Sequence, residues 1–297
     1  IRDRTLRGRP FGLGVLRSAV AGFPFRSHPG SSSPATAHTV QLPPGTAGPS
    51  VGARRARAQR LPADGSVVGM NWHEQIRAGF DLETTGRDPS QARIVTATIV
   101  MVDAAGRAAS SAEWLVDPGV PIPDEAAQVH GVSTERARAE GVPAAEGVVQ
   151  VLETLRDLFS ARIPVIAYNA VYDFTVMDRE ARRHGLEPLR PDRVIDPFVL
   201  DKQTDRFRKG KRTLSAVAEH FGVSLENAHT SAADALAGVH VADALARQHE
   251  KLRLDPARLH EQQVAWKAEQ SASFQEYLRR KDPQATVSQA WPVEPVA

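Results

Sequence analysis

The segment AGFDLETTG, residues 78–86, places Asp81 and Glu83 inside an apolar stretch that predicts a β-strand. Side chains alternate along a strand, so residues two apart lie on the same face. Two carboxylates on a half-buried face repel each other and lose hydration. The segment therefore predicts either a strand whose carboxylates share a positive partner or an edge strand exposed to water.

The pattern around this segment predicts an α/β fold class, because strands come first and helices then alternate with strands. The fold expected is a mixed central sheet flanked by helices. The predicted strands are residues 77–84, 92–103, 111–119, 163–169 and the first part of 192–202. The predicted helices are residues 124–131, 133–141, 144–161, 170–185, 213–222, 230–250 and 257–281.

Charge and composition divide the 297-residue chain into unlike parts. Residues 1–60 contain ten Arg and one Asp, whereas residues 61–297 carry 27 basic and 34 acidic residues. Residues 1–69 are rich in Pro, Gly, Ser and Arg without regular periodicity, so we expect a disordered tail or a mis-started segment, with a targeting segment as the alternative. We expect residues 70–250 to form the main domain and residues 251–297 to form a helix with a loose tail.

Two absences in the sequence narrow the classes of protein. There is no cysteine, which excludes disulfides, thiolate zinc sites and cysteine nucleophiles and fits a reducing compartment such as the cytoplasm. No run of about 18 apolar residues is present, so we expect no membrane span.

Four acidic positions and one histidine carry the candidate chemistry. Taken singly, each has an ordinary structural explanation, such as a solvated strand edge or a first-turn helix charge. Taken together, carboxylates at a strand, at a helix start and near the start of a late helix suit hard divalent cations such as Mg²⁺ or Mn²⁺. The residues are Asp81, Glu83, Asp173, Asp234 and His229.

The sequence resembles the exonucleases of the DEDDh type, similar to the epsilon proofreading subunit of bacterial DNA polymerase III. FDLETTG, AYNAVYDF and HTSAAD match the three exonuclease motifs in order, and VHGVST at residues 129–134 matches a segment between the first two. The resemblance covers about residues 76–248 and implies an RNase H-like fold. Tyr168 and Tyr172 stand where the family more commonly has His and Phe.

The resemblance also implies roles for residues of this chain. Asp81, Glu83, Asp173 and Asp234 would be ligands of two Mg²⁺ (or Mn²⁺) ions, and His229 would be the general base. The implied reaction removes nucleoside 5′-monophosphates from a free 3′ end, with single-stranded DNA as the expected substrate. The same resemblance gives Thr84 and Asn169 as contacts to the terminal nucleotide, although turn and cap roles are an equal alternative.

A basic segment, DKQTDRFRKGKRT at residues 201–213, offers the acidic domain a way to hold a polyanion. Phosphate contact combined with stacking on Phe207 is typical of single-strand binding. The alternative is an ordinary solvated surface. The other candidate substrate-binding residues are Arg208, Lys209, Lys211 and Arg212.

Three alternative functions remain open from the sequence. The chain could be an exoribonuclease that trims RNA 3′ ends or short oligoribonucleotides, because no residue that reads a 2′-hydroxyl is identified. It could be a relative that binds nucleic acid without cleaving it. The helix at residues 257–281 could dock a DNA polymerase subunit, or pack on its own domain.

Overall fold

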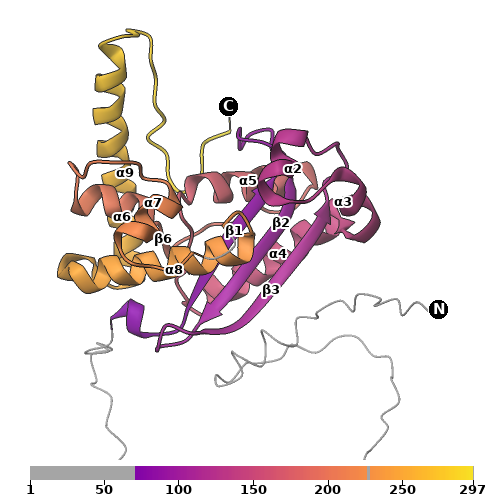
Figure 1. Cartoon of the computed structure of the whole chain (residues 1–297), viewed down its shortest axis with the longest axis horizontal. Coiled ribbons are helices and arrows are strands. Elements are labelled where there is room, and N and C mark those ends of the chain that lie inside the picture. Colours follow the sequence, from indigo (N-terminus) through magenta and orange to yellow (C-terminus); the bar gives the residue numbers. More distant parts are fainter. Residues whose placement is uncertain (1–70, 226–227, 297) are drawn as a thin grey trace, which may run out of the picture.

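The computed structural model describes residues 71–225 and 228–296 (Figure 1). The prediction about residues 1–69 lies outside the described residues. Within the described ranges, the fold is a mixed sheet with helices on both faces, as the sequence predicts. No described helix is long and apolar enough to cross a membrane.

The sheet has six strands in the order β4-β3-β2-β1-β5-β6. Strands β1, β2 and β3 form an antiparallel meander, whereas β5 pairs parallel with β1, β6 with β5, and β4 with β3. The strand bounds are β1 (Arg77–Thr84), β2 (Ile94–Val102), β3 (Ala108–Asp117), β4 (Val142–Pro143), β5 (Val165–Ile166) and β6 (Val194–Ile195).

The helices occupy the connections between strands. Their bounds are η1 (Trp72–Glu74), α2 (Asp124–His130), α3 (Thr134–Glu140), α4 (Ala144–Ser160), α5 (Val171–Arg183), α6 (Pro197–Thr204), α7 (Leu214–His220), α8 (Ser231–Gln248), η2 (Glu250–Leu252) and α9 (Pro256–Arg279). Each predicted helix is present, and α9 begins and ends within two residues of its predicted bounds.

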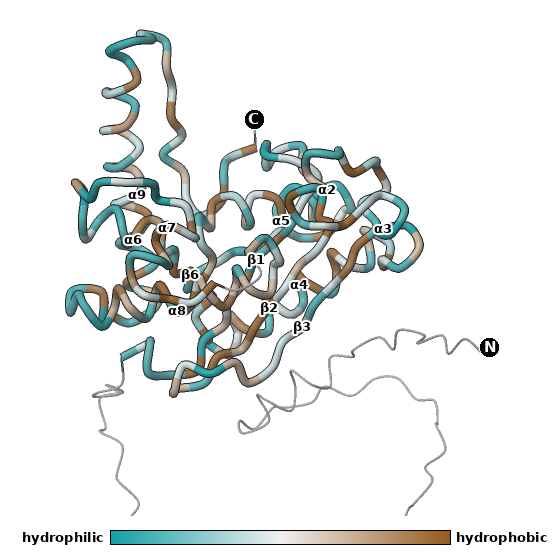
Figure 2. The backbone as a smooth tube through the Cα atoms, viewed as in Figure 1, coloured by the Kyte–Doolittle hydropathy of each residue, from teal (hydrophilic) through white to brown (hydrophobic). Residues whose placement is uncertain are grey.

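A hydrophobic cluster lies on each face of the sheet, and the alternation along β1 explains how the two sides differ. Phe80 and Leu82 point to the side of α4 and α5 and pack with Leu152 and Phe174. The opposite side of β1 carries the acidic residues and is covered by α8. Figure 2 shows the hydrophobic residues concentrated along the strands and the hydrophilic residues along the segment that joins α6 to α7.

The C-terminal segment is part of the fold. In α9, the Gln263 side chain is fully buried, accepts a hydrogen bond from the Asp196 N–H at 2.7 Å and donates to the Val194 carbonyl at 3.0 Å. The tail that follows is not loose, contrary to the sequence prediction. Trp291 is 6% exposed, and its Nε1 donates to Asp196 Oδ2 at 3.2 Å. Burial of this large indole holds the proline-containing tail against the core.

Candidate active site

Strand β1 presents Asp81 and Glu83 on the face that α8 covers. Their neighbours on β2 are Thr98 and Thr96, in the same register. Gly79, two residues earlier on this face, lets α8 approach closely, because a Cβ atom there would lie 2.5 Å from the Ala235 carbonyl oxygen. The start of α8 is therefore held directly over the acidic part of β1.

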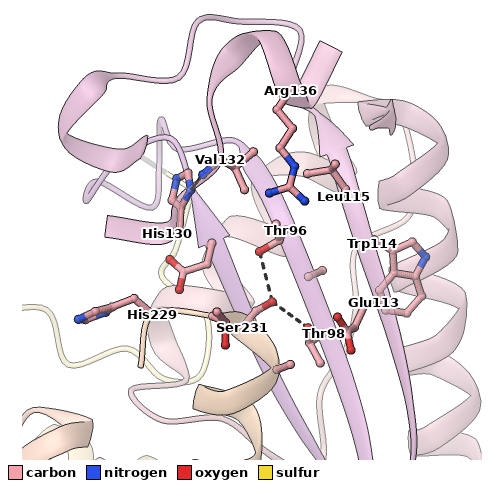
Figure 3. A pocket seen from close by; sticks show the side chains of 14 residues that line it. Thr96, Thr98, Glu113, Trp114, Leu115, His130, Val132, Arg136, His229 and Ser231 are labelled. Carbon is pink, nitrogen blue, oxygen red and sulfur yellow. Dashed lines mark hydrogen bonds between the residues drawn. The ribbon is translucent and has the colours of Figure 1, made fainter. Parts of the chain in front are cut away.

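Hydrogen bonds fix the first turn of α8 on the sheet. Ser231 Oγ bonds with Thr98 Oγ1 at 2.8 Å and with Thr96 Oγ1 at 3.2 Å (Figure 3). Asp234 lies three residues after Ser231, and residues three apart share a helix face. Asp234 therefore faces the sheet beside the two carboxylates of β1.

Asp173 reaches the same place from the first turn of α5. Its Oδ1 accepts a hydrogen bond from the Leu82 N–H, between the two acidic residues of β1, at 3.1 Å. The turn before α5 is held by Asp196, which accepts hydrogen bonds from the Asn169 N–H at 2.8 Å and the Ala170 N–H at 3.0 Å. Asn169 has a positive φ of 60°, which Asn tolerates better than most residues.

The structure thus brings the four predicted carboxylates into one cluster. One carboxylate oxygen from each of Asp81, Glu83 and Asp234 lies within 4.8 Å of the others. Burial raises the pKa of Asp81 well above its ordinary range, and the charges of Asp173, Glu83 and Asp234 raise it further. Burial and then the charge of Asp234 raise the pKa of Glu83 to about 7.

The donor set fits divalent cations. It consists of carboxylate oxygens, which hard cations such as Mg²⁺ and Mn²⁺ prefer. None of the ion pairs in the described part of the chain involves these four carboxylates. Burial is the largest cause of the raised pKa values and the neighbouring carboxylates add to it, and a bound cation would offset this negative charge.

His229 is near the cluster through its backbone, but its ring is not. The His229 N–H donates to Asp234 Oδ1 at 3.4 Å, and the residue is exposed with a positive φ of 71°. In Figure 3 the imidazole points away from the pocket. The match to the third motif identifies His229 as the candidate general base. Its side-chain direction depends on a rotamer that the sequence does not specify.

A pocket of about 370 Å³ opens beside Glu83 and His229. It is floored by β2 and β3 and bounded by the segment from α2 to α3, from which His130 and Arg136 line it. Figure 3 shows the Arg136 guanidinium directed into it. We assigned neither residue a role from the sequence, although the VHGVST match ended two residues before Arg136 and contained His130.

Thr84 and Asn169, the two predicted contacts to the terminal nucleotide, differ in how exposed they are. Thr84 is 8% exposed; its Oγ1 donates to the Gly86 carbonyl at 2.9 Å and hydrogen bonds with the Tyr172 hydroxyl. Thr84 is thus engaged in the turn, which is the structural role weighed from the sequence. Asn169 is exposed, and its backbone N–H is held by Asp196.

The basic segment also divides into two groups. Arg208 and Arg212 both form ion pairs with buried Asp201, and their side chains are only 9% and 14% exposed. The Tyr168 hydroxyl donates to the Arg212 carbonyl at 2.7 Å, which holds the segment against the turn before α5. Both arginines are therefore engaged within the fold, and their contact with a substrate stays a prediction.

The exposed members of the segment are the remaining candidates for substrate contact. The Phe207 side chain is 87% exposed, with the Arg206 guanidinium 5.8 Å from its ring centroid. Lys209 and Lys211 are also exposed.

The arrangement of the cluster is that of a known family. The RNase T family model, described as Exonuclease, matches residues 78–242. This chain belongs to the RNase T exonuclease family. The matched range contains the four carboxylates and His229, so the family resemblance predicted from the motifs is confirmed.

Curated proteins with similar sequences include DNA polymerases III of the PolC type. The sequence is 26% identical to that of Pediococcus pentosaceus over 179 residues and to that of Streptococcus agalactiae serotype III over 177 residues. Each match covers 59% of this chain and 12% or 11% of the relative, respectively. The chain therefore spans only about an eighth of the length of these relatives.

Solved structures similar to this chain include exonuclease I. The E. coli enzyme in complex with a dT13 oligonucleotide matches with a TM-score of 0.52 and 18% identity, covering 60% of this chain and 42% of that chain. The exonuclease I of Methylocaldum szegediense matches with a TM-score of 0.51 and 20% identity over the same shares. At these identities the likeness shows a common RNase H-like fold.

Proposed function

We propose that this chain is a divalent-metal-dependent 3′→5′ exonuclease that removes nucleoside 5′-monophosphates from DNA, with single strands as its preferred substrate. One observation carries the proposal: in a chain of an exonuclease family, carboxylate oxygens of Asp81, Glu83 and Asp234 lie within 4.8 Å of one another, with no cationic partner among the described residues. A purely structural role would leave this repulsion uncompensated.

The residues divide the work of phosphodiester hydrolysis between them. Asp81, Glu83, Asp173 and Asp234 would hold two Mg²⁺ or Mn²⁺ ions. When bound, such ions lower the pKa of water and stabilise negative charge on a reacting phosphate. Backbone hydrogen bonds already orient two of these carboxylates, because Asp173 Oδ1 accepts the Leu82 N–H and Asp234 Oδ1 accepts the His229 N–H.

His229 supplies the general base in this proposal. An imidazole side chain is suited to proton transfer around neutral pH. The backbone N–H of His229 already contacts Asp234, so the residue lies next to the cluster. Rotation about the side-chain torsions would bring its imidazole to the reacting water. Rotamer changes of an exposed side chain are fast compared with turnover.

The choice of DNA and of single strands rests on the relatives. The E. coli exonuclease I structure holds a dT13 oligonucleotide, and the PolC-type relatives are DNA polymerases. The second candidate activity is cleavage of RNA 3′ ends. Association with a DNA polymerase subunit is a further proposal, supported by the names of these relatives alone.

A cleavage assay tests the proposed function. The full chain and an Asp234→Ala variant would receive 5′-labelled single-stranded DNA, mismatched primer-template and RNA, with Mg²⁺, Mn²⁺ or EDTA. We expect metal-dependent, stepwise shortening from the 3′ end, fastest on single-stranded DNA and absent in the variant. If RNA is shortened faster than DNA, RNA is the preferred substrate. If no substrate shortens while single strands are still retained in a gel, the chain is a binding protein.

A further inference from the structure

The upper half of α9 carries an aromatic face that is about half exposed in the described part of the chain. In Figure 1 this half, drawn in yellow, stands clear of the rest of the fold. In the lower half, Gln263 is buried and Trp266 packs against the core. Eleven residues are three helical turns, so Phe274 lies within about 20° of Gln263, and Tyr277 within about 20° of Trp266. The side of α9 that packs on the core in its lower half therefore continues into the upper half, where α9 extends beyond the core.

The two aromatic residues form one exposed surface. The rings of Phe274 and Tyr277 are stacked, with centroids 6.4 Å apart and planes 14° apart, and the residues are 49% and 53% exposed. We call these two residues the α9 platform. The returning tail lies on another side of the helix, where the Val287 N–H donates to Gln275 Oε1 at 2.9 Å.

The charges around the α9 platform are positive. Arg206, from the basic segment, donates to Ser273 Oγ at 2.8 Å. Lys281 follows Phe274 by two turns on the same side of the helix. The acidic residues of this half, Glu269 and Glu276, lie about 140° and 160° around the helix axis from Phe274, and about 80° and 100° from Tyr277.

Further cationic and aromatic groups lie between the α9 platform and the active site. Lys202 Nζ lies 5.0 Å from the Phe198 ring centroid, and Phe198 packs edge-on against Tyr168, the residue before Asn169. Burial and then the charge of Lys267, on α9, lower the pKa of Lys202. In the described part of the chain neither lysine forms an ion pair with a carboxylate.

We propose that the α9 platform and the lysines between α6 and α9 bind the single strand upstream of its 3′ end, so that bases stack on Phe274 and Tyr277 while phosphates approach Lys202, Lys267 and Arg206. This inference rests on the proposed function and extends it to a second contact region. The α9 platform and Lys267 lie outside residues 78–242, which the family model covers, whereas Lys202 and Arg206 lie within that range.

Charge and chemistry favour a single strand as the occupant of this face. Aromatic faces flanked by cations bind unpaired bases and their phosphates together, without reading sequence. The exposed ring of Phe207, next to Arg206, extends the same combination onto the basic segment. Lys281 lies on the same side of α9 as Phe274, and Glu269 and Glu276 lie on the far side of the helix from that ring, which suits a polyanion better than a protein partner.

The test compares two lengths of labelled oligo-dT, about 4 and about 30 nucleotides, because single-strand sites span several nucleotides. The variant is Phe274→Ala/Tyr277→Ala in the full chain, and the matched control is Glu269→Gln/Glu276→Gln on the other side of the same helix. Cleavage is measured with Mg²⁺, and binding of the longer strand is measured separately in EDTA by fluorescence anisotropy.

We expect the platform variant to lose about tenfold in kcat/KM on the longer strand and to match the wild type on the shorter one, with a similar loss of affinity in EDTA. The control should retain both activities. An unchanged kcat/KM and affinity on the longer strand would overturn the inference. An equal loss on both lengths would do the same. If the wild type cleaves neither strand, the proposed function fails, and the affinity ratio in EDTA still decides the inference.

Discussion

Two clusters of like charges in this molecule have opposite chemistry. On the segment between α6 and α7, Arg208 and Arg212 share the buried carboxylate of Asp201, so their charges are compensated within the fold. On β1 and α8, the carboxylates of Asp81 and Glu83 meet Asp234 with no cationic partner in the described part of the chain.

The difference indicates which charges belong to the scaffold. A compensated cluster stabilises its own segment, whereas an uncompensated one costs stability and is retained for what it binds. The basic segment is a run of charge in the sequence, whereas the acidic cluster combines residues from positions 81, 83 and 234. The fold distinguishes the clusters, because Asp201 pairs with the two arginines while no cation in the described part of the chain forms an ion pair with the three carboxylates.

The largest effect that would sharpen the comparison is on catalysis. His229→Ala removes the proposed general base beside the carboxylate cluster, and we expect kcat to fall by about 10²–10⁴-fold with little change in binding of single-stranded DNA. Single-turnover cleavage and anisotropy with the same labelled strand would measure both. A variant that keeps wild-type kcat across the neutral pH range would show that another group accepts the proton.

The next effect concerns the compensated cluster. Asp201→Ala leaves two arginines without their buried partner, and we expect the free energy of unfolding to fall by about 3 kcal/mol. Urea unfolding would measure the loss. Arg208→Lys serves as the milder control, because it keeps the charge. If Asp201→Ala unfolds like the wild type, the arginines are not held by this carboxylate, and the prediction that they contact substrate would regain support.

The smallest effect is a pH dependence of stability that arises in the acidic cluster. The pKa of Glu83 is raised from 4.5 to about 7, so between these values the folded protein holds a proton that the unfolded chain has released. The stability of the metal-free protein should therefore fall as pH rises through this window. Replacement of Glu83 by an uncharged residue should remove part of this loss of stability at higher pH.

We expect Glu83→Gln in EDTA to be more stable than the wild type by about 1–2 kcal/mol at about pH 8, and equal to it at about pH 4. Mg²⁺ should stabilise the wild type more at the higher pH, because the ligands must be deprotonated. Thermal unfolding at several pH values, with and without Mg²⁺, measures these differences. A wild type that becomes more stable as pH rises in EDTA would contradict the raised pKa.

Several features could not be read from the sequence, for physical reasons that differ. The sequence predicts Arg208 and Arg212 as substrate contacts, but it does not show that Asp201, the first residue of the basic segment, is buried and forms an ion pair with each of them. The tail was expected to be loose because it contains prolines, but Trp291 finds a buried acceptor in Asp196, 95 residues earlier in the chain. Such long-range partners leave no local pattern.

The sequence by itself determined the order of elements and the identity of the site. The alternation along β1 puts Asp81 and Glu83 on one face, and the helical spacing after Thr230 turns Asp234 toward the sheet, both through local backbone geometry. Only the tertiary structure decided which charges are compensated and where α9 projects. Those outcomes depend on contacts between residues far apart in the chain, whose burial sets the energy of each charge.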